Sequence, residues 1–134
     1  MALRFLLDTH IVIRWLVEPR KLSREQTRVL REAVRRGEPV GVSAVSLLEI
    51  AVLLEGGSHR IKAGIEELLG DLETNPVFRI LPLTVEVAVE VFALGGALRD
   101  PADRAIVATA RVHRARLLTS DQRIVESGLV LVVE

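Results

Sequence analysis

Cysteine is absent from this chain of 134 residues, and aromatic residues are scarce, with one tryptophan, three phenylalanines and no tyrosine. A chain without cysteine forms no disulfide and no thiolate metal site, which fits the reducing cytoplasm. No apolar run approaches the ~20 residues that span a bilayer, and Asp8 interrupts the apolar start too early for a signal peptide. We therefore expect a cytoplasmic protein without membrane attachment.

An excess of charge of either sign is also lacking, since 18 basic residues balance 18 acidic ones. This balance excludes a strongly basic nucleic-acid coat, although local basic patches remain possible. Arginine supplies 16 of the 18 cations, and its planar fork suits phosphate recognition and surface ion pairs equally well. The length and the 49% of hydrophobic residues predict one globular domain over residues 1–134.

The stretch RDPADRAIVATA, residues 99–110, has the pattern of a helix start. Asp100 is in the N-cap position, Pro101 is the first helical residue and Asp103 the third. The residues that follow are apolar, so we expect a largely buried helix. Capping alone would explain both acids, and the position of the other acids decides whether they also form a site.

Short apolar segments alternate with helical patterns along the whole chain. Strands are predicted at residues 4–7, 40–42, 78–81, 116–119 and 129–133, with helices between them. This alternation is typical of a three-layer α/β/α fold, with a central, mainly parallel sheet of about five strands and helices on both faces. Such folds bind ligands at the carboxyl ends of their strands.

Helical spacing also predicts which residues face the core. Ser23 and Gln26 form a capping box for a helix that buries Val29, Leu30, Ala33 and Val34 and ends at Gly37. The helix after Thr84 is expected to bury Val85, Ala88, Val91 and Phe92, the helix after Ser43 has almost no polar face, and Trp15 belongs to a core stripe. A further helix carries the stripe Ile61, Ile65, Leu68, Leu69 and Leu72, and residues 55–60 are expected to form a loop.

Asp8, Asp103 and Asp121 stand where strands end or helices begin in this scheme, and Glu49 is the one charge inside the helix after the second strand. A doubly wound sheet could bring all four acids toward one edge. Carboxylates gathered at one sheet edge repel each other, so their pKa values rise unless a cation neutralises them. Carboxylates and water are the ligands that Mg²⁺ and Mn²⁺ prefer. Each acid has a structural alternative as well: Asp8 and Asp121 as helix caps, and Glu49 as the partner of a buried arginine.

Four segments together resemble the motifs of PIN-domain proteins, and most of all those of VapC-type toxin ribonucleases. They are FLLDTHIVIRWL at 5–16, SAVSLLEIAVLL at 43–54, RDPADRAIVATA at 99–110 and LLTSDQR at 117–123. The resemblance implies a PIN-like fold and a catalytic, metal-binding tetrad of Asp8, Glu49, Asp103 and Asp121. It also implies a supporting hydroxyl at Thr119 and an extra acid at Asp100, which we interpret mainly as the cap. Ala102 and Arg14 stand where many relatives carry aromatic residues.

The resemblance further implies an endoribonuclease that uses Mg²⁺ or Mn²⁺ and an activated water, and that leaves a 5′-phosphate and a 3′-hydroxyl. It implies the toxin of a toxin–antitoxin pair, with RNA as substrate, a cognate antitoxin protein as partner and a homodimer built on residues 43–72. Arg14, Arg99, Arg104 and Arg123 flank the motifs as candidate RNA contacts. Each can equally be solvated or ion-paired, Arg104 with Asp100 or Asp103. His10 follows the first acid and could approach the site, but no histidine is expected to bind the metal.

Other functions stay open. Within the nuclease hypothesis, the chain could be a housekeeping RNA-processing enzyme of the PIN type. A non-catalytic, Mg²⁺-binding α/β module is a second alternative. A receiver-type phosphoacceptor domain requires a lysine at a strand end, and the only lysines, Lys21 and Lys62, are elsewhere. A phosphatase of the Asp-x-Asp type requires an acid at position 10, which is histidine.

Overall fold

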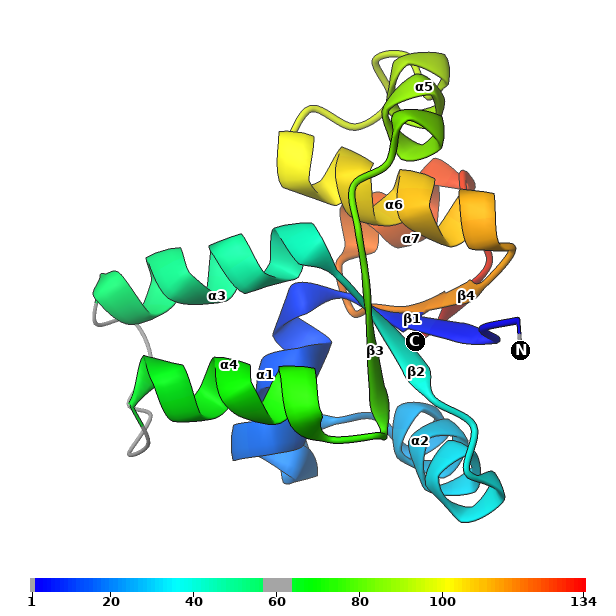
Figure 1. The fold of residues 1–134 in the computed structure, drawn as a ribbon. Coiled ribbons are helices and arrows are strands. Elements are labelled where there is room, and N and C mark those ends of the chain that lie inside the picture. The colour runs from blue at the N-terminus through cyan, green and yellow to red at the C-terminus, as the bar shows by residue number, and fades with distance from the viewer. Residues whose placement is uncertain (1, 57–63) are drawn as a thin grey trace.

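Five parallel strands form the central sheet of this protein (Figure 1), in a computed structural model that describes residues 2–56 and 64–134. In chain order they are β1 (Phe5–Leu7), β2 (Val40–Ser43), β3 (Phe78–Leu81), β4 (Arg116–Leu118) and β5 (Val132–Val133). The order across the sheet is β3-β2-β1-β4-β5, and every neighbouring pair is parallel. The predicted parallel α/β architecture is confirmed.

Helices follow each of the first four strands. They are α1 (Thr9–Val17), the 3₁₀ helix η1 (Pro19–Lys21), α2 (Arg24–Arg36), α3 (Ala44–Glu55), α4 (Ile65–Thr74), α5 (Val85–Ala93), α6 (Pro101–His113) and α7 (Gln122–Ser127). The predicted loop at 55–60 lies, from residue 57 on, outside the described residues, as does Ile61. No described helix is both long enough and apolar enough to cross a membrane.

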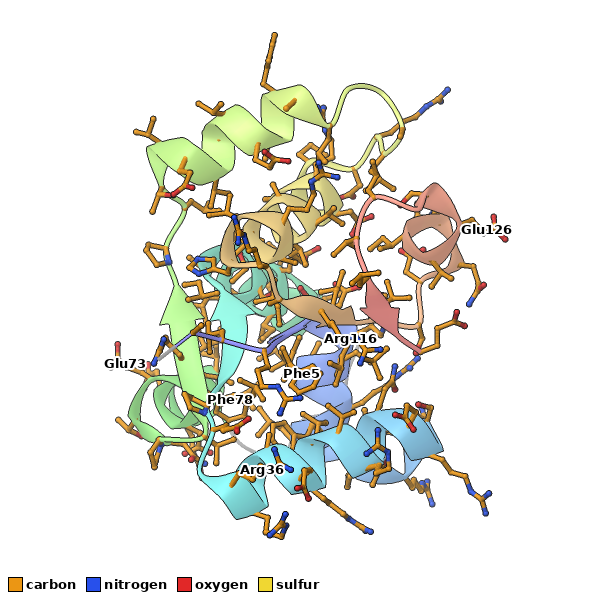
Figure 2. All side chains as sticks on the ribbon, turned by 90° about the vertical axis from the view of Figure 1, so that its right-hand side faces the viewer. Phe5, Arg36, Glu73, Phe78, Arg116 and Glu126 are labelled. Carbon is orange, nitrogen blue, oxygen red and sulfur yellow. The ribbon has the colours of Figure 1, made fainter. Side chains whose placement is uncertain are left out.

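Two cores lie on the two faces of the sheet, because successive strand side chains point to opposite sides. Phe5 and Leu7 pack with buried residues of α1, α2 and α4, whereas Leu6 packs with those of α6 and α7. Figure 2 shows side chains filling both sides of the sheet, with Phe5 and Phe78 inside and Arg36 and Glu126 at the periphery. Trp15 is half-buried, and its ring meets Phe78 edge-on at 5.5 Å between centroids.

Capping residues determine where several of the helices begin and end. The capping box of Ser23 and Gln26 is confirmed, and Gly37 ends α2 at a φ of 66°, a backbone conformation that favours glycine. Asp8, Asp100 and Asp121 are the N-caps of α1, α6 and α7. The predicted role of these acids in capping is therefore confirmed.

Several residues that were expected in the core are exposed instead. Val34 of α2 is 49% exposed, Val85 and Phe92 of α5 are 81% and 87% exposed, and α3 leaves Leu48 and Val52 in solvent. Val87 is the buried residue of α5, so the predicted stripe of that helix was wrong. Helices α3 and α5 carry exposed as well as buried apolar side chains, so helical spacing alone did not show which of them face the core.

The last strand is shorter than predicted. Residues 129–131 lie before β5, and Leu131 is 75% exposed. β5 pairs with Leu117 and Leu118 of β4, and before it the carbonyl of Leu131 accepts the N–H of Leu117.

Gly41 lies at the crowded centre of the sheet, and its replacement tests the packing. A Cβ atom there would lie 3.0 Å from methyl carbons of both Leu6 and Leu81. We expect Gly41→Val to lower the free energy of unfolding by about 1–3 kcal/mol, because overpacking forces neighbours off their rotamers. Gly70→Ala is the matched control in α4, where a Cβ meets nothing within 4 Å, and it should stabilise by about 0.5–1 kcal/mol. Urea denaturation measures both, and equal stability of the two variants would contradict the packing described here.

Candidate active site

The four predicted acids come from four different elements at the carboxyl end of the sheet. Asp8 follows β1, Asp121 follows β4, Asp103 is in the first turn of α6, and Glu49 is in the middle of α3. Figure 1 shows the beginning of α6 over α3. The topology brings these segments together because β1 lies between β2 and β4 in the sheet.

Asp8 is the most buried of the acids, with 3% of its surface exposed. Its Oδ1 accepts a hydrogen bond from the backbone N–H of Thr9 at 2.8 Å, and its Oδ2 accepts one from the Thr119 hydroxyl at 2.7 Å. The same hydroxyl oxygen accepts from the N–H of Asp121 at 3.0 Å. Thr119 therefore ties the first acid to the last and holds the ends of β1 and β4 together.

Glu49 is held by a chain of hydroxyl groups. The Thr9 hydroxyl donates to Oε1 of Glu49 at 2.5 Å, and the buried Ser46 hydroxyl lies 2.8 Å from that of Thr9. Since Thr9 gives its proton to Glu49, Ser46 is the donor to Thr9. Glu49 is therefore held by the Thr9 and Ser46 hydroxyls, and not by the buried arginine that the sequence analysis considered. Partial burial and the charges of Asp8 and Asp100 raise the pKa of Glu49, although the Thr9 hydrogen bond opposes them.

His10 and Arg14 approach the same edge from α1. Nε2 of His10 accepts the N–H of Ser120 at 3.0 Å, and its Nδ1 lies 3.4 Å from Oδ2 of Asp8. Burial lowers the pKa of His10 and outweighs the pull of Asp8 in the other direction. Arg14 donates to the Ser120 hydroxyl at 3.2 Å. His10 is thus a neutral acceptor that helps to hold the segment before Asp121.

The acids influence each other's pKa values in the way the sequence predicts. Burial, followed by the charges of Asp100, Asp8 and Asp121, raises the pKa of Asp103 to about 6. The pKa of Asp121 is lowered instead, because the Arg123 guanidinium donates to its carboxylate at 2.9 Å. Asp103 therefore lies in a field of negative charge that the protein leaves only partly compensated.

Arg123 provides the compensating charge at this edge. Its Nη2 lies 2.9 Å from Oδ2 of Asp121 and 3.6 Å from Oδ2 of Asp103, so one cation bridges two members of the tetrad. Within residues 2–56 and 64–134, no three acidic or histidine side chains are arranged to enclose an ion as they lie. The carboxylates are thus near enough to affect each other's pKa values but do not form a finished metal cage.

The other candidate residues, Asp100, Arg104 and Arg99, make contacts different from those of the four acids. Asp100 caps α6 by accepting the N–H of Asp103 at 3.0 Å. Arg104 turns to α5, where it donates to the carbonyl of Val91 at 2.9 Å, and its Nε is buried without a partner in the described part of the chain. The considered pairing of Arg104 with Asp100 or Asp103 is therefore wrong. Arg99 is exposed just before the cap.

Three residues that support the site were missed by sequence reasoning. Thr9 and Ser46 form the hydroxyl chain to Glu49, and Gln26 was assigned only to its capping box. The fully buried Gln26 amide also donates to the carbonyls of Thr119 at 3.3 Å and Val133 at 3.2 Å. Ser46 had a readable signal, since a serine inside an apolar helix one turn before an isolated glutamate needs a polar partner.

Comparison with known proteins gives one family and several relatives. The PIN domain family matches residues 5–128. Ribonuclease VapC22 of Mycobacterium tuberculosis is 35% identical over 120 residues, which are 89% of this chain and 88% of that protein.

Solved structures give the same fold. FitAcB from Neisseria gonorrhoeae matches with a TM-score of 0.68 and 26% identity, over 97% of this chain and 96% of that chain. VapBC2 from Rickettsia felis, crystallised with a DNA fragment from its promoter, matches with a TM-score of 0.72 over 98% of both chains. The identity to the latter is 13%, so that likeness concerns the fold alone.

Replacing Asp103 tests the electrostatics of the site. Folding raises the pKa of Asp103 from an ordinary value of about 4 to about 6. Between these values the folded protein binds more protons than the unfolded chain, so the contribution of Asp103 to stability falls as the pH rises through this window. We expect Asp103→Asn to raise the melting temperature of the protein in EDTA by a few degrees at pH 7.5, with no gain at pH 4.

Asp121→Asn is the matched control, because asparagine still caps α7 and the pKa of Asp121 is lowered rather than raised. This variant should show no gain at pH 7.5. Thermal denaturation followed by circular dichroism measures both. A lower melting temperature for Asp103→Asn at pH 7.5 would mean that Arg123 compensates the negative field in full.

Proposed function

The chain belongs to the PIN-domain family, and we propose that it is an endoribonuclease that cleaves RNA phosphodiester bonds with an activated water and Mg²⁺ or Mn²⁺. The observation that carries the proposal is the set of four carboxylates at one sheet edge, where burial and the charges of Asp100, Asp8 and Asp121 raise the pKa of Asp103. The 35% identity to Ribonuclease VapC22 supports RNA as the substrate.

The donor set fits a hard divalent cation. All four side chains offer carboxylate oxygens, which Mg²⁺ and Mn²⁺ prefer, and the described region around them holds no sulfur ligand. Burial and neighbouring carboxylates raise the pKa of Asp103, and the Arg123 guanidinium already lies against both Asp103 and Asp121. A divalent cation would relieve the remaining repulsion between these acids, in competition with Arg123 for the carboxylate of Asp103.

The side chains would divide the work as follows. Asp8, Asp103 and Asp121 would hold the ion, and Glu49 would bind it through water or orient the nucleophile. When bound, the metal lowers the pKa of a coordinated water and neutralises charge on the phosphodiester during an in-line displacement. Thr119 fixes the carboxylate of Asp8 and the backbone at Asp121. Arg123, once released from Asp103, and Arg14 and Arg99 are candidates for holding the phosphates, whereas Arg104 is engaged with α5.

A toxin–antitoxin pair is the biological setting that we propose. The 35% identity to Ribonuclease VapC22 supports this setting and a cognate antitoxin protein as partner, because the sequence motifs resemble those of VapC-type toxin ribonucleases. We also propose that the protein works in the cytoplasm, the compartment that would contain both its RNA substrate and its antitoxin. A housekeeping RNA-processing nuclease would use the same site, and the RNA that is cut distinguishes the two.

Cleavage of a labelled structured RNA tests the nuclease directly. We expect cutting with Mg²⁺ or Mn²⁺, none in EDTA, and products with a 5′-phosphate and a 3′-hydroxyl. Asp8→Asn should lower the rate by about a hundredfold or more, because even indirect partners of metal ligands contribute 10- to 100-fold. Asparagine keeps the capping function, so the fold should persist in circular dichroism.

Asp71→Asn is the matched control, since Asp71 is the one aspartate away from this edge, exposed on α4. It should cut like the wild type. Equal activity of Asp8→Asn and Asp71→Asn would reject the tetrad. Metal binding without cleavage of any RNA would favour a non-catalytic binding module.

A homodimer is the assembly that we propose, formed through exposed apolar side chains. Residues 43–72 were expected to supply this surface, and α3 does expose Leu48 and Val52. A second apolar row lies on α5, at Val85, Val89 and Phe92. Such contiguous exposed rows mark interaction surfaces on soluble proteins.

Phe92→Ser should weaken self-association by about tenfold or more in sedimentation velocity, because a large exposed aromatic is a typical interface anchor. Val34→Ser is the control, since Val34 is an exposed apolar residue on the opposite face, in α2. A wild-type protein that is monomeric at high concentration would contradict the dimer.

A further inference from the structure

Five exposed arginines lie along one side of η1 and α2, in a chain whose net charge is zero. We call them the arginine face: Arg20, Arg24, Arg28, Arg31 and Arg35. On α2 the intervals are four, three and four residues, which is the spacing of one helix face. With a rise of ~1.5 Å per residue, the row of four spans roughly 16 Å.

Acidic partners neutralise only part of this face. Glu25 pairs with Arg28, and Glu32 pairs with Arg35 and with Arg36 behind it. Arg20, Arg24 and Arg31 have no acidic partner in the part of the chain that the structure describes. Like charges three and four residues apart destabilise a helix. The row therefore does not serve the stability of α2, and the unpaired charges are free for an anionic ligand.

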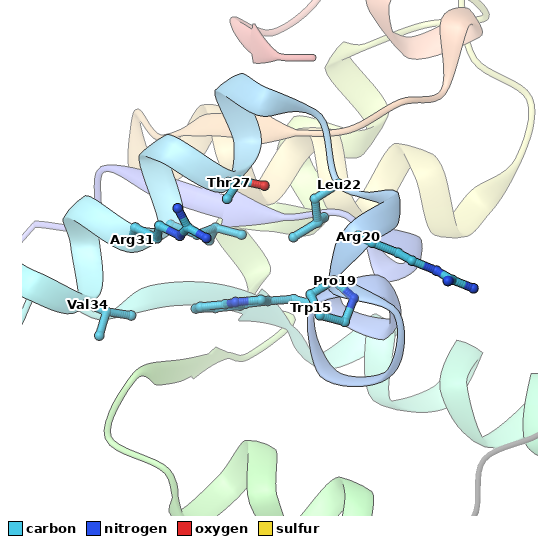
Figure 3. A pocket seen from close by; sticks show the side chains of 8 residues that line it. Trp15, Pro19, Arg20, Leu22, Thr27, Arg31 and Val34 are labelled. Atoms are coloured by element: carbon cyan, nitrogen blue, oxygen red, sulfur yellow. The ribbon is translucent and has the colours of Figure 1, made fainter.

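Two adjoining hollows accompany the arginine face. One of about 450 Å³ is lined by Arg24, Arg28, Arg31 and Arg35 together with Glu32, the partner of Arg35. The other, of about 570 Å³, is lined by Trp15, Arg20 and Arg31, and both include Leu22 and Thr27. Figure 3 shows the Trp15 ring edge-on along one side of the larger hollow, with Leu22, Thr27 and Arg31 along the other. An aromatic wall beside unpaired cations is the combination that single-stranded nucleic acids require, since phosphates bind the cations and bases stack on the ring.

The arginine face is connected to the candidate active site. At the start of α2, the Gln26 amide donates to the carbonyl of Thr119 and lies 3.4 Å from the Ser120 hydroxyl, directly before Asp121. A smaller hollow of about 170 Å³ is lined by His10 and Arg14 of α1 and by Lys21, which pairs with Glu18 in the same lining. Lys21 and Arg20 are neighbours in η1, so this hollow extends from residues near the site to the end of the face.

We propose that the arginine face binds a single-stranded segment of the RNA substrate outside the cleavage site, with phosphates on Arg24 and Arg31 and a base against Trp15. This inference rests on the proposed ribonuclease function. An acidic peptide would also match the charges. A regular row of arginines that leads to the site where phosphodiesters are cut favours a polyanion with regularly spaced phosphates.

The test is binding of a fluorescein-labelled, 20-nucleotide single-stranded RNA of random sequence, in EDTA, between 50 and 250 mM salt. We expect Arg24→Gln with Arg31→Gln to weaken binding about tenfold at 0.15 M salt. The slope of log affinity against log salt should fall by about 1.4, since each phosphate contact on a single strand contributes about 0.7. The control is Arg111→Gln with Arg114→Gln, two exposed arginines at the far end of α6 that change the net charge equally.

Trp15 gives a second readout, because it is the only tryptophan of the chain. The RNA should quench its fluorescence in the wild type and in the control, and much less in the Arg24 and Arg31 variant at the same RNA concentration. An unchanged salt slope in that variant, or RNA binding that leaves Trp15 fluorescence unaltered, would overturn the proposal. So would a 20-residue acidic peptide that depends on Arg24 and Arg31 while the RNA does not.

Cleavage kinetics distinguish a failure of this inference from a failure of the proposed nuclease function. At saturating RNA and with Mg²⁺, the Arg24 and Arg31 variant should keep kcat within twofold of the wild type while KM rises, because the face binds RNA away from the reacting bond. A fall in kcat with KM unchanged would overturn the role of the face. A wild type that binds RNA with the expected salt slope and cuts none would reject the nuclease and leave the RNA surface standing.

Discussion

The hydroxyl of Thr119 is the contact on which the geometry of the site depends. It donates to Asp8 and accepts from the backbone of Asp121, so both of its hydrogen-bonding directions are used between two acids. Asp8 is a carboxylate with 3% of its surface exposed, and burial of such a group is costly unless hydrogen bonds replace water. Thr119 and the N–H of Thr9 provide those bonds. The adjacent parallel strands β1 and β4 are thereby joined at their carboxyl ends by side chains as well as by the sheet.

Stability and function oppose each other at this edge. Asp8 has a hydrogen-bond donor at each carboxylate oxygen and Asp121 has Arg123, whereas burial and the charges of Asp100, Asp8 and Asp121 raise the pKa of Asp103 to about 6. The first turn of α6 is already capped by Asp100, so capping does not account for Asp103. Asp8 and Asp121 combine two roles, since each caps a helix and each belongs to the proposed site.

The sequence predicted the order of elements and the parallel sheet well, because short apolar strands, proline and glycine breaks and capping residues are local signals. It predicted the burial of α3 and α5 poorly. An apolar stripe such as Val85, Val89 and Phe92 looks the same in a sequence whether it meets the sheet or solvent, and only the packing shows that Val87 occupies the core. The supporting residues Thr9, Ser46 and Gln26 were missed for a related reason. Their hydrogen-bond partners lie 37 to 107 residues away, so a local pattern can show that Ser46 needs a polar partner but not which residue provides it.

Net charge was the least informative quantity of all, although it is the simplest to read. The zero sum of this chain combines an acidic sheet edge with an arginine row on α2, and the two cancel only in the total. Glu25 and Glu32 pair with three of the arginines of α2, and the pKa of Glu32 falls to about 2 in consequence. Arg24 and Arg31 are left without such partners although both flank these glutamates in sequence. In the proposed function, the acids would repel the phosphates of an RNA substrate and the arginines of α2 would attract them. The proposed metal ion would therefore be needed at the acids, whereas the arginines alone would bind phosphates on α2.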